Sequence, residues 1–294
     1  MVQSDETPDL AFSCKPVETA RNLNGADRIY CSDSKNKYGE SAVQLFRHSD
    51  TEIMRFPRIA DFFISPGSIE CDLLAPRIAY MVEICLLGHV LAYTLERAGV
   101  SPIHGASLDF DGRAAILIGD SGAGKSTLAA SMLCAGVPLV ADDIAALEIR
   151  DTAAFCRPGY PQIKLTPEQA HYFAGSTDGY EKVHQDFQKL GVPVADLGTF
   201  TGNPLPVGGI YILERTDAET DTPVQLVPLS QAESLKELLK NSFITEIVDT
   251  TDMRVPRLQR LARTVRILRV TRLRYPGGYD RLPEVLRAVR ADLG

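Results

Sequence analysis

A glycine-rich run at residues 119–127 is the part of this sequence with the clearest chemical potential. It reads Gly119-Asp120-Ser121-Gly122-Ala123-Gly124-Lys125-Ser126-Thr127 and matches the pattern G-x-x-x-x-G-K-[ST]. Glycines carry no Cβ, so successive backbone N–H groups can turn toward phosphate oxygens. A helix that begins at the end of this loop directs its positive end at the same anion. We therefore predict that these residues bind nucleotide phosphates, with Lys125 at the β- and γ-phosphates and Ser126 on Mg²⁺.

Two adjacent aspartates, Asp142 and Asp143, follow the apolar segment 138–141. At a strand end near a phosphate loop, one carboxylate can hold the metal ion that accompanies the phosphates. Consecutive side chains of an extended strand point in different directions, so the other carboxylate can accept the proton of an incoming hydroxyl. A helix N-cap or a solvated turn is the alternative interpretation of the pair.

The elements around these residues predict an α/β core. Apolar segments at 106–110 and 114–118 flank an Asp111-Gly112 turn, which is typical of a hairpin. The glycine loop leads into a predicted helix over 125–135, and a strand at 138–141 follows, which completes a strand–loop–helix–strand unit. The sequence lacks G-x-G-x-x-G, so nothing in it supports a Rossmann dinucleotide site.

The N-terminal region has a different pattern. Short apolar groups alternate with turn residues between 41 and 75, which predicts a small β-rich subdomain. Apolar residues at helical spacing predict one helix over 76–98. We expect three parts: a β-rich subdomain at 1–75, a connecting helix at 76–100 and a catalytic domain at 101–294.

Arginines recur every three residues near the C-terminus. They lie in a predicted helix at 254–263 and in and after a predicted strand at 264–270, and a further helix is predicted at 281–292. The series is Arg254, Arg257, Arg260, Arg263, Arg266, Arg269 and Arg272. Residues 254–294 carry a formal charge of +8, against −15 for the remainder and −7 overall. The net charge argues against a general nucleic-acid or membrane partner. The arginines either form salt bridges with the acidic body or make a basic wall that holds a substrate or a neighbouring subunit.

The six cysteines show no C-x-x-C pair or zinc-ligand pattern, so we expect reduced thiols. The N-terminus, MVQSDETPDL, is acidic and polar and does not resemble a signal peptide. The most apolar stretch, about 73–95, is interrupted by charged residues, so no membrane span is expected. These features predict a cytoplasmic protein.

Several of these segments together resemble the catalytic core of the HPr kinase/phosphorylase family. They are Ile103-His104-Gly105, Asp111-Gly112, the loop through Ser126, Gly136 and Leu139-Val140-Ala141-Asp142-Asp143. The resemblance implies a P-loop kinase core of the HPr kinase C-terminal type, which phosphorylates a protein serine with ATP and Mg²⁺. It also implies that Asp142 is the base, that His104 supports it, and that Asp143 and Ser126 hold the metal.

One departure from the family lies after the aspartates. The bifunctional enzymes carry an Arg-Gly-Leu-Gly-Ile-type signature, where this chain has Arg157-Pro158-Gly159-Tyr160-Pro161-Gln162-Ile163. This change argues against phosphorylase activity and against HPr as the substrate. The retained Arg157 is the first candidate for a further catalytic cation, ahead of Lys164 and Lys182. The layout is closer to divergent HPr-kinase-like proteins, some of them from lasso-peptide clusters.

Three classes of function remain open on the sequence. The first is a serine kinase for a peptide or small protein, such as a lasso precursor peptide, acting as a homo-oligomer. The second is a kinase for a small hydroxylated molecule, and the third is a nucleotide-binding regulatory protein without turnover.

Overall fold

The computed structural model describes residues 10–74, 76–183, 188–216 and 223–294, and its fold is mixed α/β. The chain forms two compact units: unit 1 is Met1–Thr94 with Ile244–Arg254, and unit 2 is Leu95–Phe243 with Val255–Gly294. The predicted boundaries at 75 and 100 did not anticipate that 244–254 belongs with the N-terminal residues. No helix within the described ranges is both long and apolar enough to cross a membrane.

Unit 1 is built on a six-stranded sheet in the order β1-β6-β5-β4-β3-β2. Its strands are β1 (Ala11–Pro16), β2 (Asp27–Cys31), β3 (Gln44–His48), β4 (Thr51–Phe56), β5 (Ala60–Ser65) and β6 (Ser68–Leu73). All neighbours are antiparallel except β1 and β6, which run parallel. Alternate residues such as Leu45, Met54 and Phe62 are fully buried, because successive side chains of a strand point to opposite faces. The predicted β-rich region is therefore present among the described residues.

The predicted helix over 76–98 is interrupted. The segment consists of a 3₁₀ turn (Pro76–Ile78), α1 (Tyr80–Cys85), a π turn (Leu86–Val90) and α2 (Leu91–Arg97). Val82, Cys85, Val90 and Tyr93 are buried in one cluster with the unit 1 sheet. Ile247 and Val248 of α6 (Thr245–Asp249) join the same cluster. These buried side chains explain why most of the predicted connecting helix, and residues 244–254, belong to unit 1.

Unit 2 contains an eight-stranded sheet in the order β11-β10-β7-β8-β14-β16-β15, with β9 paired to β7. The strands are β7 (Ser101–Phe110), β8 (Arg113–Ile118), β9 (Leu139–Ala141), β10 (Ile144–Arg150), β11 (Ala153–Arg157), β14 (Leu205–Thr216), β15 (Gln225–Pro228) and β16 (Val270–Pro276). β11 also pairs with β14, so five of these strands close into a ring. The predicted hairpin turn is present, with Asp111 and Gly112 both at positive φ.

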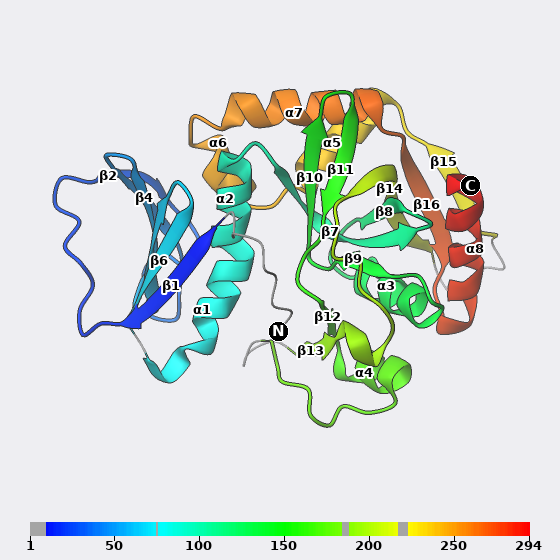
Figure 1. The fold of residues 1–294 in the computed structure, drawn as a ribbon, viewed down its shortest axis with the longest axis horizontal. Helices are drawn as coiled ribbons and strands as arrows, with labels where there is room; N and C mark the ends of the chain where they lie inside the picture. The colour runs from blue at the N-terminus through cyan, green and yellow to red at the C-terminus, as the bar shows by residue number, and fades with distance from the viewer. Residues whose placement is uncertain (1–9, 75, 184–187, 217–222) are drawn as a thin grey trace. The chain divides into compact units, whose positions relative to one another are not determined.

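Helices cover both faces of this sheet (Figure 1). One buried cluster joins β7 and β8 to α3 (Lys125–Cys134) and α8 (Leu282–Leu293). A second joins the sheet to α5 (Gln231–Lys240) and α7 (Arg254–Ile267). β12 (Gln162–Leu165) and β13 (Leu190–Pro193) form a separate two-stranded sheet. Along the chain, α4 (Pro167–Ala174) lies between these two strands.

The predicted helices near the C-terminus are confirmed, but the predicted strand at 264–270 is largely wrong. α7 continues to Ile267 and the strand β16 begins at Val270. Leu261, Thr264 and Val265 are buried at helical spacing, so packing of this face extends the helix past the predicted end. Val255 and Leu258 of the same helix are 61% and 46% exposed.

The arginine series is engaged mainly by carboxylates and carbonyl oxygens of the same unit. Arg260 pairs with Glu96, and Arg263 donates to the carbonyl oxygen of Asp151. Further pairs join Arg269 to Asp292 at 2.6 Å, and Arg272 to Glu214 at 3.3 Å and to Glu237 at 3.7 Å. These contacts correspond to the salt-bridge alternative for those arginines.

Gly105 allows β7 to approach the strand that leads into the glycine loop. A Cβ at this position would lie 2.6 Å from the carbonyl oxygen of Leu117 and 2.8 Å from a methyl carbon of Ile118. We expect Gly105→Ala to lower the free energy of unfolding by about 1–3 kcal/mol, because the strands must move apart. Gly88→Ala is the control, since no atom lies within 4 Å of a methyl group added there. Urea unfolding of both variants checks this, and equal losses would contradict it.

Candidate functional site

The loop between β8 and α3 has the conformation that its glycines predict. Gly122 and Gly124 have φ of 82° and 94°, values that residues with a Cβ adopt only under strain. The Tyr275 hydroxyl donates a hydrogen bond of 2.7 Å to the carbonyl oxygen of Ala123. A Cβ on Gly124 would collide with that hydroxyl. Tyr275 therefore fixes the conformation of the loop. The glycines of the loop leave its backbone uncovered by side chains.

Lys125 lies against its own loop. Its Nζ donates to the carbonyl oxygens of Gly119 at 2.6 Å and Asp120 at 3.2 Å. Burial and the nearby ammonium of Lys189 lower the pKa of Lys125. A phosphate group would relieve both effects by supplying negative charge next to the ammonium. The Asp120 carboxylate is paired at 2.6 Å with Lys240 at the end of α5.

Lys164 on β12 contacts both predicted aspartates. Its backbone N–H donates to Oδ2 of Asp142 at 2.9 Å, and its ammonium pairs with Oδ2 of Asp143. Asp143 has a positive φ of 71°, which turns the chain sharply between β9 and β10. Thus one residue holds two adjacent carboxylates that point in different directions.

The two aspartates differ in acidity. Burial, together with the charge of Asp143, raises the pKa of Asp142 to about 6. Burial acts in the same direction on Asp143, but the ion pair with Lys164 outweighs it and lowers the pKa of Asp143. At neutral pH, Asp143 is a stable anion and Asp142 is the better proton acceptor.

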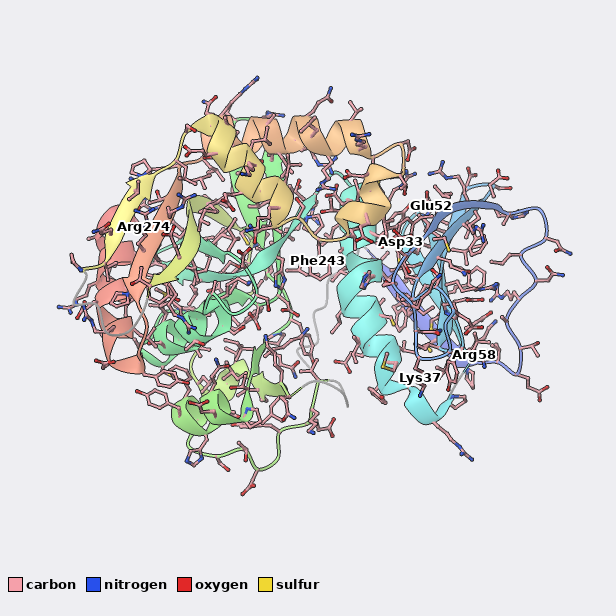
Figure 2. All side chains as sticks on the ribbon, turned by 180° about the vertical axis from the view of Figure 1, so that it is seen from behind. Asp33, Lys37, Glu52, Arg58, Phe243 and Arg274 are labelled. Carbon is pink, nitrogen blue, oxygen red and sulfur yellow. The ribbon has the colours of Figure 1, made fainter. Side chains whose placement is uncertain are left out.

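His104 lies on β7 beside these carboxylates. Its ring Nδ1 is 3.1 Å from the backbone oxygen of Asp143, and its backbone N–H donates to the oxygen of Asn241 at 2.7 Å. The ring packs against Phe243, labelled in Figure 2, with centroids 5.7 Å apart. Burial and the charge of Lys125 lower the pKa of His104. Because a carbonyl oxygen only accepts, Nδ1 carries the proton, and the neutral ring keeps Nε2 as an acceptor.

A single cavity of about 330 Å³ brings most of the predicted residues together. Its lining includes the predicted residues His104, Ser121, Gly122, Gly124, Lys125, Ser126, Thr127, Asp142 and Asp143. Gly119, Asp120 and Ala123 shape the loop without lining the cavity. Thr166, Gln169, Lys189 and Arg215 also line it. No sequence motif contains these four residues, so their place in the cavity was not predicted.

Arg157 does not line this cavity. It lies on β11, where its Nε donates to Glu148 of the neighbouring strand at 2.9 Å. Pairing across β10 and β11 directs the guanidinium to Glu148. The structure therefore does not bring this predicted catalytic cation to the cavity. Lys182 does not line the cavity either, and the cations that do so besides Lys125 are Lys189 and Arg215.

A second cavity of about 330 Å³ adjoins the first and shares Gly124, Thr127, Gln169 and Arg215 with it. Tyr275 and Tyr279 form part of its wall, together with Glu168 and the glycines at 277 and 278. The Tyr279 ring is stacked on that of Tyr172, with centroids 4.1 Å apart and planes 14° apart. This aromatic wall beside the loop has the chemistry to contact a planar ring.

The oxygen atoms of the side chains in the first cavity suit a hard cation that binds together with phosphate. No three His, Cys, Asp or Glu side chains are grouped to hold a metal within the described part of the chain. Mg²⁺, however, is commonly bound by one or two carboxylates together with substrate phosphates and water. Asp142, Asp143 and the Ser126 hydroxyl line one cavity and offer such oxygens.

Comparisons with known proteins add little at the level of sequence. No family model and no curated protein matches the chain. Among solved structures it is similar to the Hpr(Ser) kinase/phosphatase from Coxiella burnetii, at 15% identity and a TM-score of 0.35. That match covers 65% of this chain and 97% of the other. Because this TM-score is low, the function must follow from the site itself.

The raised pKa of Asp142 predicts a pH dependence of stability. The folded state binds the Asp142 proton more tightly than the unfolded state, so this contribution is present at about pH 4 and lost toward about pH 6. The amide that replaces the carboxyl group in Asp142→Asn cannot ionise and avoids the loss. We expect the variant to gain about 1–3 kcal/mol on the wild type across this window. Urea unfolding from pH 4 to 7 measures the difference, and parallel curves would contradict the assignment.

Proposed function

We propose that this protein is an ATP- and Mg²⁺-dependent kinase that transfers the γ-phosphate to a serine hydroxyl of a peptide or protein. The observation that carries the proposal is the cavity that joins the glycine loop and Lys125 to Asp142, Asp143 and His104. A phosphate loop by itself supports only binding. A buried carboxylate of raised pKa next to that loop adds a group able to accept a hydroxyl proton.

Each side chain has a distinct role in this mechanism. Asp142 accepts the proton of the serine hydroxyl as the oxygen attacks the γ-phosphorus of ATP in line, the bond from that phosphorus to the bridging oxygen breaks, and ADP leaves. His104, a neutral acceptor at Nε2, orients the hydroxyl or the base beside it. Lys125, Lys189 and Arg215 balance the negative charge that spreads over the transferred phosphoryl group.

Asp143 and Ser126 are the residues that would hold Mg²⁺, which when bound neutralises charge on the β- and γ-phosphates. The ion pair between Asp143 and Lys164 keeps the carboxylate ionised before that point. Lys164 is therefore a local counter-ion for Asp143 in the absence of nucleotide.

The second cavity supports a nucleotide as the phosphate donor. It shares Gly124 and Thr127 with the first cavity, and Tyr279 provides an aromatic surface for the base of the nucleotide. Bare pyrophosphate or triphosphate would leave this surface unused. ATP would fill both cavities.

The exposure of the aspartate end favours a polypeptide acceptor. The side chains of Asp143 and Lys164 are 29% and 31% exposed, so this end of the cavity is open to solvent. A serine on a protruding segment of a polypeptide can therefore approach Asp142. A homo-oligomer, and the absence of nucleic-acid and membrane partners, complete the proposal.

Asp142→Asn tests the assignment of the base. We expect this variant to bind ATP normally and to lose phosphoryl transfer by about 10²–10⁴-fold, because the amide cannot accept the proton. Mass spectrometry of seryl peptides, intact HPr and small hydroxylated compounds incubated with ATP and Mg²⁺ measures transfer and identifies the acceptor class.

The exposed Asp178→Asn is the matched control and should retain activity. Near-normal transfer by Asp142→Asn would exclude it as the base. ATP consumption with small hydroxylated compounds alone would favour the small-molecule alternative, and no consumption with any acceptor would favour a regulatory protein.

Tyr279→Ala tests the position of the nucleoside. Loss of stacking should weaken ATP binding by about 5–150-fold, since aromatic stacking of a base contributes about 1–3 kcal/mol. Binding of inorganic triphosphate should not change. Calorimetric titration with both ligands measures this, with the 55% exposed Tyr160→Ala as control. An equal loss for both ligands would contradict a nucleoside contact.

A further inference from the structure

Two cysteines far apart in the sequence lie directly opposite each other in unit 1. Cys14 of the edge strand β1 is the register partner of Cys71 on β6, and the two strands run parallel. Cys14 is exposed and Cys71 is buried. An accessible thiol therefore stands next to a protected one, separated by a single strand spacing.

The backbone geometry of this pair is compatible with a disulfide. Neighbouring strands lie about 4.8 Å apart, within the range of about 4.4–6.8 Å that disulfides span between Cα atoms. Directly paired residues project from the same face of a sheet. The Cys14 thiol is near enough to Cys71 to contribute to the raised pKa of the Cys71 thiol.

β1 can adjust to form the bond. All six of its residues are exposed, and it pairs with β6 at one edge of the sheet. Cys71, by contrast, belongs to the buried cluster of the unit. The edge strand can therefore move toward β6 without disturbing the core.

The surroundings assign different roles to the two sulfurs. Burial, and then the neighbouring Cys14 thiol, raise the pKa of Cys71, so the Cys71 thiol stays protonated at neutral pH and is not the first to react with a dissolved oxidant. The exposed Cys14 is the sulfur that a dissolved oxidant reaches first. Cys71 is the thiol placed to resolve the product.

Three other cysteines lack this arrangement, and Cys85 is buried in the same cluster as Cys71 with no exposed thiol. Cys31 is exposed on β2, but its register partner is Gln44. Cys134 is exposed on α3 and its thiol faces the carbonyl oxygen of Phe173. Cys156 is buried and donates to the hydroxyl of Ser107.

We propose that Cys14 and Cys71 form a reversible disulfide when the protein meets a peroxide. The Cys14 thiolate attacks a peroxide oxygen, the O–O bond breaks, and a sulfenic acid and one water result. The Cys71 sulfur loses its proton and attacks the Cys14 sulfur, the S–O bond breaks, and a second water leaves. Two thiols and one hydrogen peroxide thus yield one disulfide and two waters, and a dithiol reductant reverses the change.

The bond would fasten the edge strand to the sheet. In the reduced protein β1 is held on one side by strand pairing, and such an exposed edge opens easily. A covalent link between Cys14 and Cys71 prevents that opening. The consequence is local and independent of the proposed kinase reaction.

Peptide mapping of the full chain after treatment with hydrogen peroxide tests this. We expect a loss of two alkylatable thiols and a cross-linked peptide joining Cys14 to Cys71 of the same chain, reversed by dithiothreitol. Amide hydrogen exchange at residues 11–15 should slow by about tenfold or more in the oxidised protein.

Cys31→Ser is the control and should retain the cross-link, while Cys14→Ser should lose it and keep Cys71 reduced. A cross-link between Cys71 and Cys85, an intermolecular disulfide, or sulfinic acid at Cys14 with Cys71 reduced would overturn the proposal. A mapped Cys14–Cys71 bond with unchanged exchange would overturn the fastening of β1.

Discussion

The structure of the candidate site depends on how two adjacent carboxylates are kept together in a partly buried place. Repulsion between Asp142 and Asp143, added to burial, raises the energy of the doubly ionised pair. Lys164 offsets this cost in two ways, with a backbone N–H on Asp142 and an ammonium on Asp143. The unequal contacts separate the acidities of the two groups, so that one suits proton transfer and the other cation binding.

Packing around the glycine loop imposes a second constraint. β8 is buried up to Ile118, Gly105 brings β7 close to it, and Tyr275 of β16 holds the carbonyl of Ala123. Three strands therefore set the position of the loop. Its own hydrogen bonds, such as that from the Ala123 N–H to the carbonyl oxygen of Asp120, add to this constraint, and a loop whose conformation is already determined suits an anion site at the start of α3.

The uneven charge of the chain has a structural explanation in unit 2. Arginines of α7 and β16 bind carboxylates from the acidic part of the same unit, such as Glu96 and Glu214. The contrast between an acidic body and a basic C-terminal segment is thus partly neutralised within the fold. Period-three spacing along α7 distributes its arginines around the helix circumference; Arg260 pairs with Glu96, and Arg263 donates to the carbonyl oxygen of Asp151.

Local spacing and turn chemistry predicted the glycine loop, the hairpin before it, the aspartate pair after it and most helices of unit 2. Which distant side chains meet depends on how the whole chain folds. Lys189 and Arg215 line the cavity while Arg157 pairs with Glu148, residues 244–254 join unit 1, and Cys14 faces Cys71. Strand register and the burial of apolar faces bring these residues together. Neither can be recognised from a fixed spacing of residues along the chain.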